Sequence, residues 1–364
     1  MPIEDFSQLA DELVTCYAQG VLEKARQTAR NHVRIGDQNS RLIQSISSIS
    51  NQMQRYQEPE SLDAALDAID LAKIYEGVEK REKDAANGSS KDVLGYEDYI
   101  VLETLGYFKN DFFRWVNSPK CGKCGQDGSN MEFRRSEGPP TPNPDEISRV
   151  EVHHCKTCNE DATFPRYNSP VKLLETREGR CGEWVNCFML ILLAVLGSTA
   201  NIRYVWNHED HVWCEYYSEK QKRWIHLDPC ENVFDEPSLY CENWGKKMSW
   251  VLAVSDVNIA DVSDKYITKE DKKIAKLSVA NEKEVLEYIH WAQEKLLVRY
   301  WDQKIDPFLL STHDKLAKLY VEIVKRNDRP TRTSGSTPTP AATERGRQSG
   351  KGEWTKSRGE DGNK

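Results

Sequence analysis

The sequence predicts an α+β protein in which one buried helix packs against an antiparallel sheet. Three observations indicate this fold. Residues 185–195 are almost continuously apolar and Gly197 follows them, as expected of a buried helix that ends at a glycine. Stretches rich in Tyr, Trp, Val and Ile then occur at 202–206, 211–217 and 223–228, and these predict strands. Two Cys-x-x-Cys pairs lie upstream, which predicts a separate metal-binding lobe.

Helices are predicted on both sides of this core. Apolar residues recur at helical spacing between Asp5 and about Arg30, over 60–76 and 92–116, and over 285–301, with a shorter helix expected at 307–325. The residues from 328 onward are rich in Ser, Thr, Gly and Pro, so we expect them to be disordered. The expected segments are an N-terminal helix at 1–35, a helical lobe at 36–118, a metal lobe at 119–165, the core at 166–275, C-terminal helices at 276–327 and a tail at 328–364.

Cys181 is the predicted nucleophile, because it lies at the amino end of the buried helix within Gly-Arg-Cys-Gly-Glu-Trp. Unpaired backbone N–H groups and the helix dipole favour a thiolate there. A single cysteine in apolar surroundings is more often a packing residue. The helix-start position and the His/Asp pair described next outweigh that reading for Cys181. Nothing comparable surrounds the cysteines that we interpret as core or incidental thiols, namely Cys187, Cys214, Cys230 and Cys241.

His211 and Asp228 are the predicted base and acid. If the turn between the second and third strands is centred between Glu219 and Lys220, antiparallel pairing places positions 211 and 228 opposite each other; a slip of two residues leaves them diagonal neighbours. An acid bonded to one imidazole nitrogen leaves the other nitrogen to exchange a proton with sulfur. Two other histidines, His208 and His226, rank below His211.

Cys121, Cys124, Cys155 and Cys158 form two Cys-x-x-Cys knuckles separated by thirty residues. This spacing is typical of one tetrahedral Zn²⁺ held by four thiolates. Such a site has no open coordination position, so we expect a single structural zinc ion. A redox role is the alternative, but a redox motif would occur singly and within a βαβ pattern.

Composition fits a cytosolic enzyme. The chain has 38% hydrophobic and 30% charged residues, no apolar run long enough to cross a membrane, and an acidic start unlike a signal peptide. Its ten cysteines include four with zinc spacing, which indicates a reducing compartment. A net charge of −8 argues against nucleic-acid binding, although residues 329–364 carry eight Lys or Arg against four Asp or Glu. Import into the nucleus is left open.

Several ordered motifs resemble the cytoplasmic peptide:N-glycanases, in their compact, fungal-type form, over roughly residues 94–268. The motifs are Gly-Arg-Cys-Gly-Glu-Trp-x-Asn-Cys-Phe at 179–188, Arg-Tyr-Val-Trp-Asn at 203–207, Asp-His-Val-Trp-Cys-Glu-Tyr at 210–216, His-Leu-Asp-Pro-Cys-Glu at 226–231, Trp-Gly-Lys-Lys-Met-Ser at 244–249, and Phe-Phe-Arg-Trp-Val-Asn at 112–117 before the paired knuckles. The resemblance implies a transglutaminase-like, papain-related core and a deglycosylating amidase.

The resemblance also implies how the residues act. Cys181, His211 and Asp228 fall on the catalytic positions, and the reaction passes through a thioester and converts Asn to Asp. Trp213 and Glu231 occupy positions that the family uses around the chitobiose unit. Trp115 is a candidate for binding the developing oxyanion through its indole N–H, by analogy with transglutaminases. The expected partners are misfolded N-glycoproteins in ER-associated degradation and a ubiquitin-like/ubiquitin-associated proteasome shuttle protein bound by terminal helices.

Two alternatives from other classes stay open. A cysteine protease or transglutaminase would use the same three residues on another acyl group. A non-catalytic adaptor would bind only glycans or proteasomal partners. Deglycosylation of a denatured glycoprotein, compared with Cys181→Ala, distinguishes all of them.

Overall fold

A six-stranded antiparallel sheet forms the centre of the protein. The computed structural model describes residues 3–31, 40–87, 94–197, 201–304, 346–350, 352–358, 360 and 362. The strand order is β11–β10–β6–β7–β8–β9. The strands are β6 (Ile202–Asn207), β7 (His211–Ser218), β8 (Arg223–Asp228), β9 (Val233–Phe234), β10 (Val251–Val254) and β11 (Ile259–Asp261). The predicted three strands are therefore confirmed and lie in the middle of the sheet.

Helix α7 (Cys181–Leu196) is the buried helix that the apolar run predicts. Residues 183–193 are all buried, and the helix packs against β6 and β7. It is also covered by three further helices, which are α3 (Pro59–Ala68), α5 (Tyr96–Tyr107) and α6 (Pro170–Thr176). Gly197 ends α7 with a φ of 93°, a conformation that favours glycine. The α+β fold is thus confirmed.

The β7–β8 hairpin has a register two residues away from the one assumed in the sequence argument. Ser218 pairs with Arg223 and Cys214 with Leu227, so the turn is centred between Lys220 and Gln221. The turn comprises residues 219–222, so its centre lies one position later than assumed, and this moves the pairing by two residues. Within the turn, Lys222 has a φ of 55° and donates its N–H to the Ser218 carbonyl at 2.8 Å. Position 228 consequently lies diagonal to position 211.

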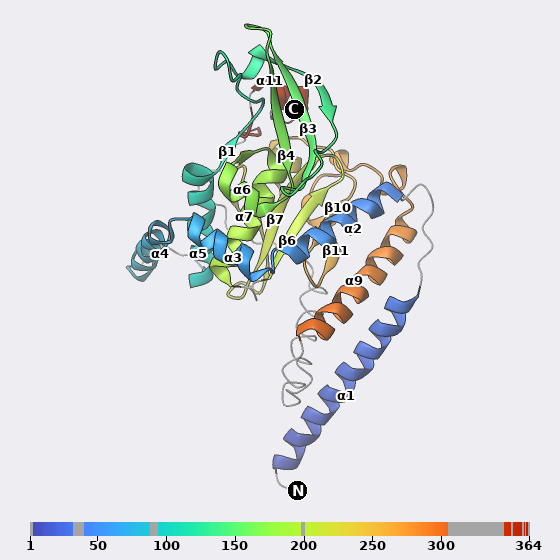
Figure 1. Ribbon diagram of the computed structural model, residues 1–364. Helices are drawn as coiled ribbons and strands as arrows, with labels where there is room; N and C mark the ends of the chain where they lie inside the picture. Colours follow the sequence, from blue (N-terminus) through green and yellow to red (C-terminus); the bar gives the residue numbers. More distant parts are fainter. Residues whose placement is uncertain are drawn as a thin grey trace.

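A second, three-stranded sheet carries the cysteine knuckles and projects from the core at the top of Figure 1. Its strands are β2 (Met131–Glu137), β3 (Ile147–Cys155) and β4 (Asp161–Tyr167). The segment between the knuckles thus forms two of these strands, joined at 138–146. A short parallel pair, β1 (Arg114–Trp115) and β5 (Glu178–Gly179), joins the residues before the lobe to those just before α7.

Long helices flank the core. The predicted terminal helices correspond to α1 (Ile3–Arg30) and α9 (Glu282–Lys304), which pack together below the core in Figure 1. The helix expected at 60–76 is two helices, because the chain is extended at Ile69 and a new helix begins after Asp70. The remaining helices are α2 (Ser40–Arg55), α4 (Leu71–Ala86), α8 (Ser263–Tyr266) and α11 (Gly352–Ser357). Within the described residues, no helix combines the length and apolarity that crossing a bilayer requires.

Part of the tail differs from the sequence expectation. Residues 346–350 and 352–358 have a defined position and include α11, although their composition predicts disorder. Two arginines of this segment, Arg347 and Arg358, form ion pairs with acidic partners, and Arg347 is buried. These charge pairs supply the fixed contacts that an apolar core supplies elsewhere. The helix predicted at 307–325 lies outside the described residues.

Candidate active site

Cys181 occupies the first position of α7, as predicted. The residue before it, Arg180, is extended, and the Glu183 carboxylate accepts the Arg180 backbone N–H at 3.0 Å, which forms a capping box. Cys181 keeps part of its surface exposed. Burial raises the pKa of its thiol, while the positive charge of Arg347 opposes that shift. The sulfur therefore sits at a helix start beside a cation.

His211 and Asp228 are in direct contact despite the diagonal register. His211 Nε2 lies 3.0 Å from Asp228 Oδ2, and both side chains are fully buried. The other imidazole nitrogen, Nδ1, is buried and has no hydrogen-bond partner among the described residues. Since the carboxylate accepts from Nε2–H, Nδ1 is the nitrogen left with a lone pair. This is the arrangement that a general base requires.

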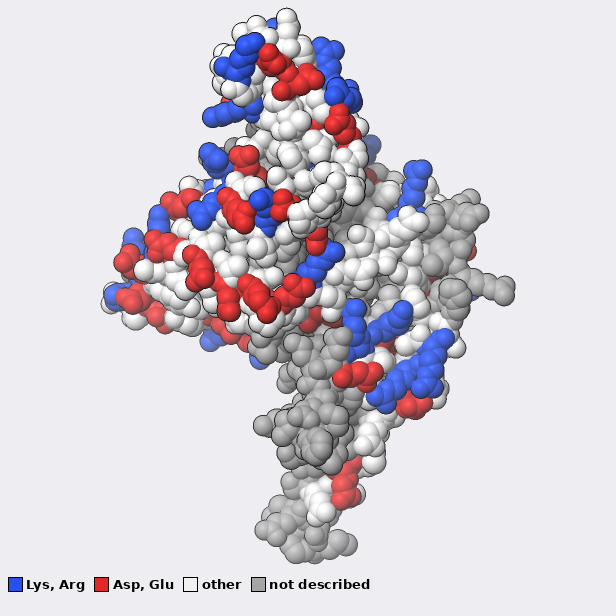
Figure 2. All heavy atoms as spheres, in the orientation of Figure 1, with Lys and Arg blue, Asp and Glu red and all other residues white. Residues whose placement is uncertain are grey.

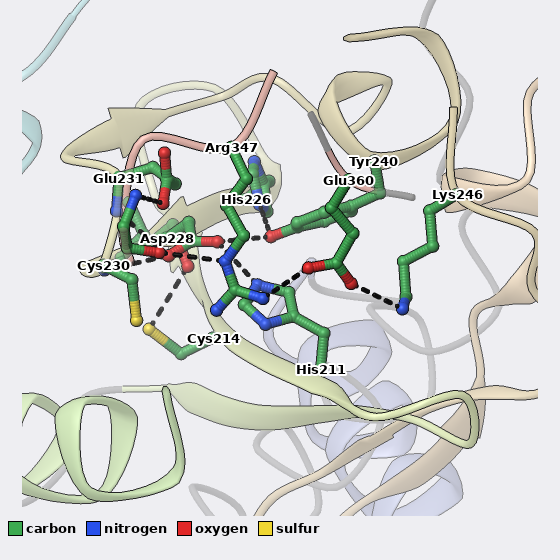
Figure 3. Close-up of polar contacts among 12 residues, drawn as sticks. His211, Cys214, His226, Asp228, Cys230, Glu231, Tyr240, Lys246, Arg347 and Glu360 are labelled. Carbon is green, nitrogen blue, oxygen red and sulfur yellow. Dashed lines mark hydrogen bonds and ion pairs between the residues drawn. The ribbon is translucent and has the colours of Figure 1, made fainter. Parts of the chain in front are cut away.

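Two residues outside the predicted triad, Tyr240 and His226, hold the acid in place. The Tyr240 hydroxyl, from a helical turn at Leu239–Asn243, donates to Asp228 Oδ2 at 3.0 Å. His226 Nδ1 accepts the Glu236 backbone N–H at 3.2 Å, so its Nε2–H donates to the Tyr240 oxygen at 2.8 Å. Figure 3 shows this chain of side chains leading to Asp228. The sequence analysis names His226 only as a lower-ranked candidate for the base. In the structure His226 contacts Tyr240, which in turn contacts Asp228.

The environment of the pair is dry. Burial, and then the charge of Arg347, lowers the pKa of His211 well below its usual value. Burial also lowers the pKa of His226 to about 3 and raises the pKa of Asp228. Together with the raised pKa of Cys181, these shifts favour a neutral thiol and a neutral imidazole in this state.

The three predicted substrate-binding residues have different positions. Glu231 follows Asp228 closely, and its carboxylate accepts the backbone N–H groups of Gln348 and Ser349 at 2.8 and 2.9 Å. Trp115 is partly exposed, and its indole N–H donates to Asn117 at 3.0 Å, so in this state that donor is already used.

Trp213 has no exposed surface. Its ring stacks on Tyr240 at 4.2 Å between centroids and lies 5.7 Å from the His211 ring. A side chain in this position packs against the His211 imidazole and has no surface available for contact with a sugar. The expectation of direct glycan contact came from the resemblance, whereas in this structure Tyr240 and Tyr266 pack against the Trp213 ring.

A buried ion-pair network joins the start of α7 to the cysteine lobe. Arg180 contacts both oxygens of Glu151 on β3, at 3.2 and 2.8 Å. Arg166 on β4 contacts Glu151 at 3.0 Å and Glu183 at 2.5 and 2.8 Å. Although burial favours a neutral Glu151, its His153 hydrogen bond and these arginines hold its pKa far below the usual value. The lobe thereby fixes the residues on both sides of Cys181.

The four predicted metal ligands come together at the end of the three-stranded sheet that lies away from α6. One sulfur atom from each of Cys121, Cys124, Cys155 and Cys158 lies within 4.8 Å of every other. The two knuckles have the same backbone form: Gly125 and Asn159 both have positive φ and donate to the carbonyls of Cys121 and Cys155, each at 2.9 Å. Four converging sulfurs on two matched turns can hold a metal ion, and thiolate donors suit soft or borderline metals such as zinc.

Comparisons with known proteins identify the family of this chain. A transglutaminase-like superfamily model matches residues 131–229, and a Rad4 transglutaminase-like domain model matches residues 200–307. A Debaryomyces hansenii protein named peptide-N(4)-(N-acetyl-beta-glucosaminyl)asparagine amidase is 50% identical over 376 residues, covering 99% of this chain and 98% of that protein. The Saccharomyces cerevisiae protein of the same name is 36% identical over 367 residues, covering 98% and 97%.

A solved structure of Rad4–Rad23 crosslinked to undamaged DNA matches with a TM-score of 0.41 and 9% identity, covering 85% of this chain and 60% of that one. This likeness is too weak to carry an argument about function. The full-length relatives are sufficient: the chain belongs to the family of peptide-N(4)-(N-acetyl-beta-glucosaminyl)asparagine amidases, hydrolases of amide C–N bonds with a transglutaminase-like fold.

Proposed function

We propose that this protein hydrolyses the bond between an asparagine side-chain amide and the first N-acetylglucosamine of an N-linked glycan, with Cys181, His211 and Asp228 as the catalytic residues. The observation that carries the assignment is the His211–Asp228 contact of 3.0 Å, which leaves His211 Nδ1 buried and unpaired among the described residues. The charge of Arg347 acts on both Cys181 and His211, which supports the assignment of the thiol and the imidazole to one site.

In the first step, His211 Nδ1 takes the proton of the Cys181 thiol, and the thiolate attacks the carboxamide carbon. Asp228 stabilises the imidazolium that forms. The C–N bond then breaks, and the imidazolium gives its proton to the departing glycosylamine nitrogen. The products of this step are a free glycosylamine and a thioester between Cys181 and the former asparagine side chain.

In the second step, water replaces the amine. His211 removes a proton from the water as it attacks the thioester carbon, and the C–S bond breaks to return the thiol. Asparagine is thereby converted to aspartate. We assign the backbone N–H of Cys181, at the start of α7, as the first donor to the oxyanion in both steps.

Substrate recognition is proposed for Glu231 and Trp115, which lie beside the catalytic residues. Glu231 offers two carboxylate oxygens, the acceptors that sugar hydroxyls or an acetamido N–H need. Trp115 also lines a cleft of about 610 Å³ between the core and the cysteine lobe, together with residues such as Asn117, Phe164 and Tyr167. A cleft of this volume can hold a segment of a peptide or a sugar chain.

We propose that the four-cysteine cluster holds one structural Zn²⁺. The ion would tie the two knuckles together and supply no open coordination position. Its effect on catalysis is then indirect, because the same lobe carries Glu151 and Arg166, which fix the residues flanking Cys181.

The cellular role that we propose is deglycosylation of misfolded glycoproteins in the cytoplasm during ER-associated degradation. A terminal helix is suited to bind a proteasome shuttle protein. The carboxyl half of α1 packs on α9, and Leu22 and Ala25 are buried, whereas Leu9, Leu13 and Tyr17 are more than half exposed. Figure 2 shows Lys and Arg side chains around these two helices on the face drawn. Replacing Leu13 by Asp should abolish capture of a ubiquitin-like/ubiquitin-associated shuttle protein, with activity on free glycopeptide unchanged; retained capture would contradict this role.

One assay tests the proposed reaction against its alternatives. Denatured N-glycoprotein is incubated with the protein or with Cys181→Ala, and the products are analysed by mass spectrometry. Release of intact glycan with aspartate at the former site, lost in Cys181→Ala, supports the proposal. Backbone cleavage would indicate a protease, amine incorporation a transglutaminase, and an unchanged substrate in both samples an adaptor.

A further inference from the structure

The described residues of the carboxyl-terminal segment, which are 346–350, 352–358, 360 and 362, lie directly on the candidate active site. Arg347 is buried, and its guanidinium lies over two tryptophan rings, 5.2 Å from the Trp115 centroid and 5.0 Å from the Trp244 centroid. Its positive charge acts on Cys181 and on His211. Figure 3 shows Arg347 and Glu360 next to the His211 imidazole. A residue near position 350 thus occupies the centre of a site built from residues 115–244.

The segment is fixed at several points around the catalytic residues. Arg347 Nη1 lies 2.7 Å from Glu360 Oε2, and Glu360 Oε1 lies 3.0 Å from Lys246 Nζ. Arg358 Nη1 lies 2.5 Å from Asp210, the neighbour of His211. These ion pairs place charged side chains of the segment next to the imidazole, and Glu360, which joins Arg347 to Lys246, is fully buried. Burial opposes ionisation of Glu360, but the charges of Arg347 and Lys246 outweigh it and hold its pKa at about 2.

The contacts also use the groups that a substrate would need. The backbone N–H groups of Gln348 and Ser349 donate to both oxygens of Glu231, at 2.8 and 2.9 Å. Arg347 covers one side of Trp115. Glu231 and Trp115 are the substrate-binding candidates of the proposed function. A glycopeptide and the segment therefore cannot contact them at the same time.

We propose that residues 346–362 act as an intramolecular inhibitor, a segment of this chain that occupies the substrate site and must leave before an N-glycopeptide binds. This inference rests on the proposed function, because it assumes that substrates bind at Cys181, Glu231 and Trp115. The segment makes no covalent bond and contributes no group to the reaction. It lowers the apparent affinity for substrate by the fraction of molecules in which the site is open: a segment docked in about 90% of molecules costs about tenfold in affinity.

The test compares the full chain with a chain that ends at Arg345. Two readouts are taken: KM and kcat for glycan release from a denatured glycoprotein, and the rate at which iodoacetamide alkylates Cys181, followed by peptide mass spectrometry. We expect truncation to lower KM about tenfold with kcat nearly unchanged, and to speed alkylation of Cys181. Arg347→Ala should reproduce most of both effects, while Lys356→Ala, a change at an exposed cation of the same segment, should reproduce neither.

A synthetic peptide of residues 346–362 provides the complementary measurement. Added to the truncated protein, it should inhibit competitively and slow alkylation of Cys181, and the same peptide with Arg347→Ala should be much weaker. Equal KM values and equal alkylation rates for the full and truncated chains would overturn the inference and leave the proposed function intact. Glycan release that does not depend on Cys181 would overturn the proposed function, while the alkylation rates would still report whether the segment covers the thiol.

Discussion

Replacing Tyr240 by Phe tests whether the acid of the catalytic site is held by a second layer of hydrogen bonds. The change removes one hydroxyl, which donates to Asp228 at 3.0 Å and accepts from His226 at 2.8 Å. Asp228 keeps its contact with His211 and accepts the backbone N–H groups of Cys230 and Glu231, at 2.9 and 3.3 Å. The acid therefore stays in place but loses one donor to its charged form.

Two effects of different size follow. The His226 N–H is left buried without its acceptor, which costs about 1–3 kcal/mol of folding free energy. Burial already raises the pKa of Asp228, and the Tyr240 hydrogen bond opposes that rise, so its loss raises the pKa further. A hydrogen bond to a charged group contributes about 1.5–3 kcal/mol, and its loss disfavours the ionised Asp228 by no more than that amount.

The assay is the pH dependence of kcat/KM for glycopeptide hydrolysis. A higher pKa for Asp228 means that a larger fraction of molecules carries a neutral acid at a given pH, so the acidic limb should move to higher pH. At the former optimum, kcat/KM should fall about tenfold.

Tyr266→Phe is the matched control. Tyr266 is equally buried and also donates its hydroxyl to a buried carboxylate, that of Glu215 at 2.7 Å, which is not part of the site. It should lower stability by a similar amount and leave the acidic limb where it was. An unshifted limb in Tyr240→Phe, or an equal shift in both variants, would refute the reasoning.

Three further predictions concern the supports of the site. Glu215→Gln should lower the free energy of unfolding by about 3–5 kcal/mol in urea titrations, because Arg203 and Lys265 would keep buried charges without their carboxylate. Burial opposes ionisation of Glu215, but these two cations outweigh it and lower its pKa from 4.5 to about 2. The stabilisation is therefore present above pH 4.5 and lost as the pH falls toward 2. A variant with the same acid unfolding profile as the parent would contradict this. Cys121→Ser should lower the bound zinc measured by elemental analysis and the Tm, whereas Cys16→Ser, a change at an exposed cysteine, should alter neither. Glu151→Gln should reduce kcat more than it changes KM, since Arg180 next to the nucleophile loses its ion pair; a change in KM alone would argue against a positioning role.

The parts of the fold that follow from local sequence were predicted well. The apolar run ending at Gly197 gave the position of α7, and the β-branched and aromatic stretches gave β6, β7 and β8 nearly to the residue. The register was wrong by two residues because the turn lies one position later than assumed, at 219–222, where Lys222 adopts a positive φ. The prediction of His211 beside Asp228 tolerates that error, since diagonal neighbours on one face are still within reach of a long side chain.

Contacts between distant segments could not be predicted. Strand periodicity correctly places Trp213 on the same face as His211, but only the fold shows that Tyr240 and Tyr266 bury that face. Residues 211–218 are all buried, so the polar alternation that marks an exposed face is missing from the strand. The ordered tail was missed for a related reason: composition measures how much apolar surface a segment can bury, whereas this segment is held by ion pairs to residues more than a hundred positions away.

Ion pairs connect the cysteine lobe to the residues on both sides of the proposed nucleophile. A thiol at a helix start is useful only if the helix start cannot move relative to the imidazole, which is anchored in the sheet. The body of α7 packs on that sheet, but the flanking residues Arg180 and Glu183 are held through Glu151 and Arg166 from the lobe. Any loss of order in the lobe removes these ion pairs together, leaving two charges at the helix start without partners. If the proposed zinc ion is required for the order of the lobe, its removal should lower kcat even though it takes no part in the proposed reaction.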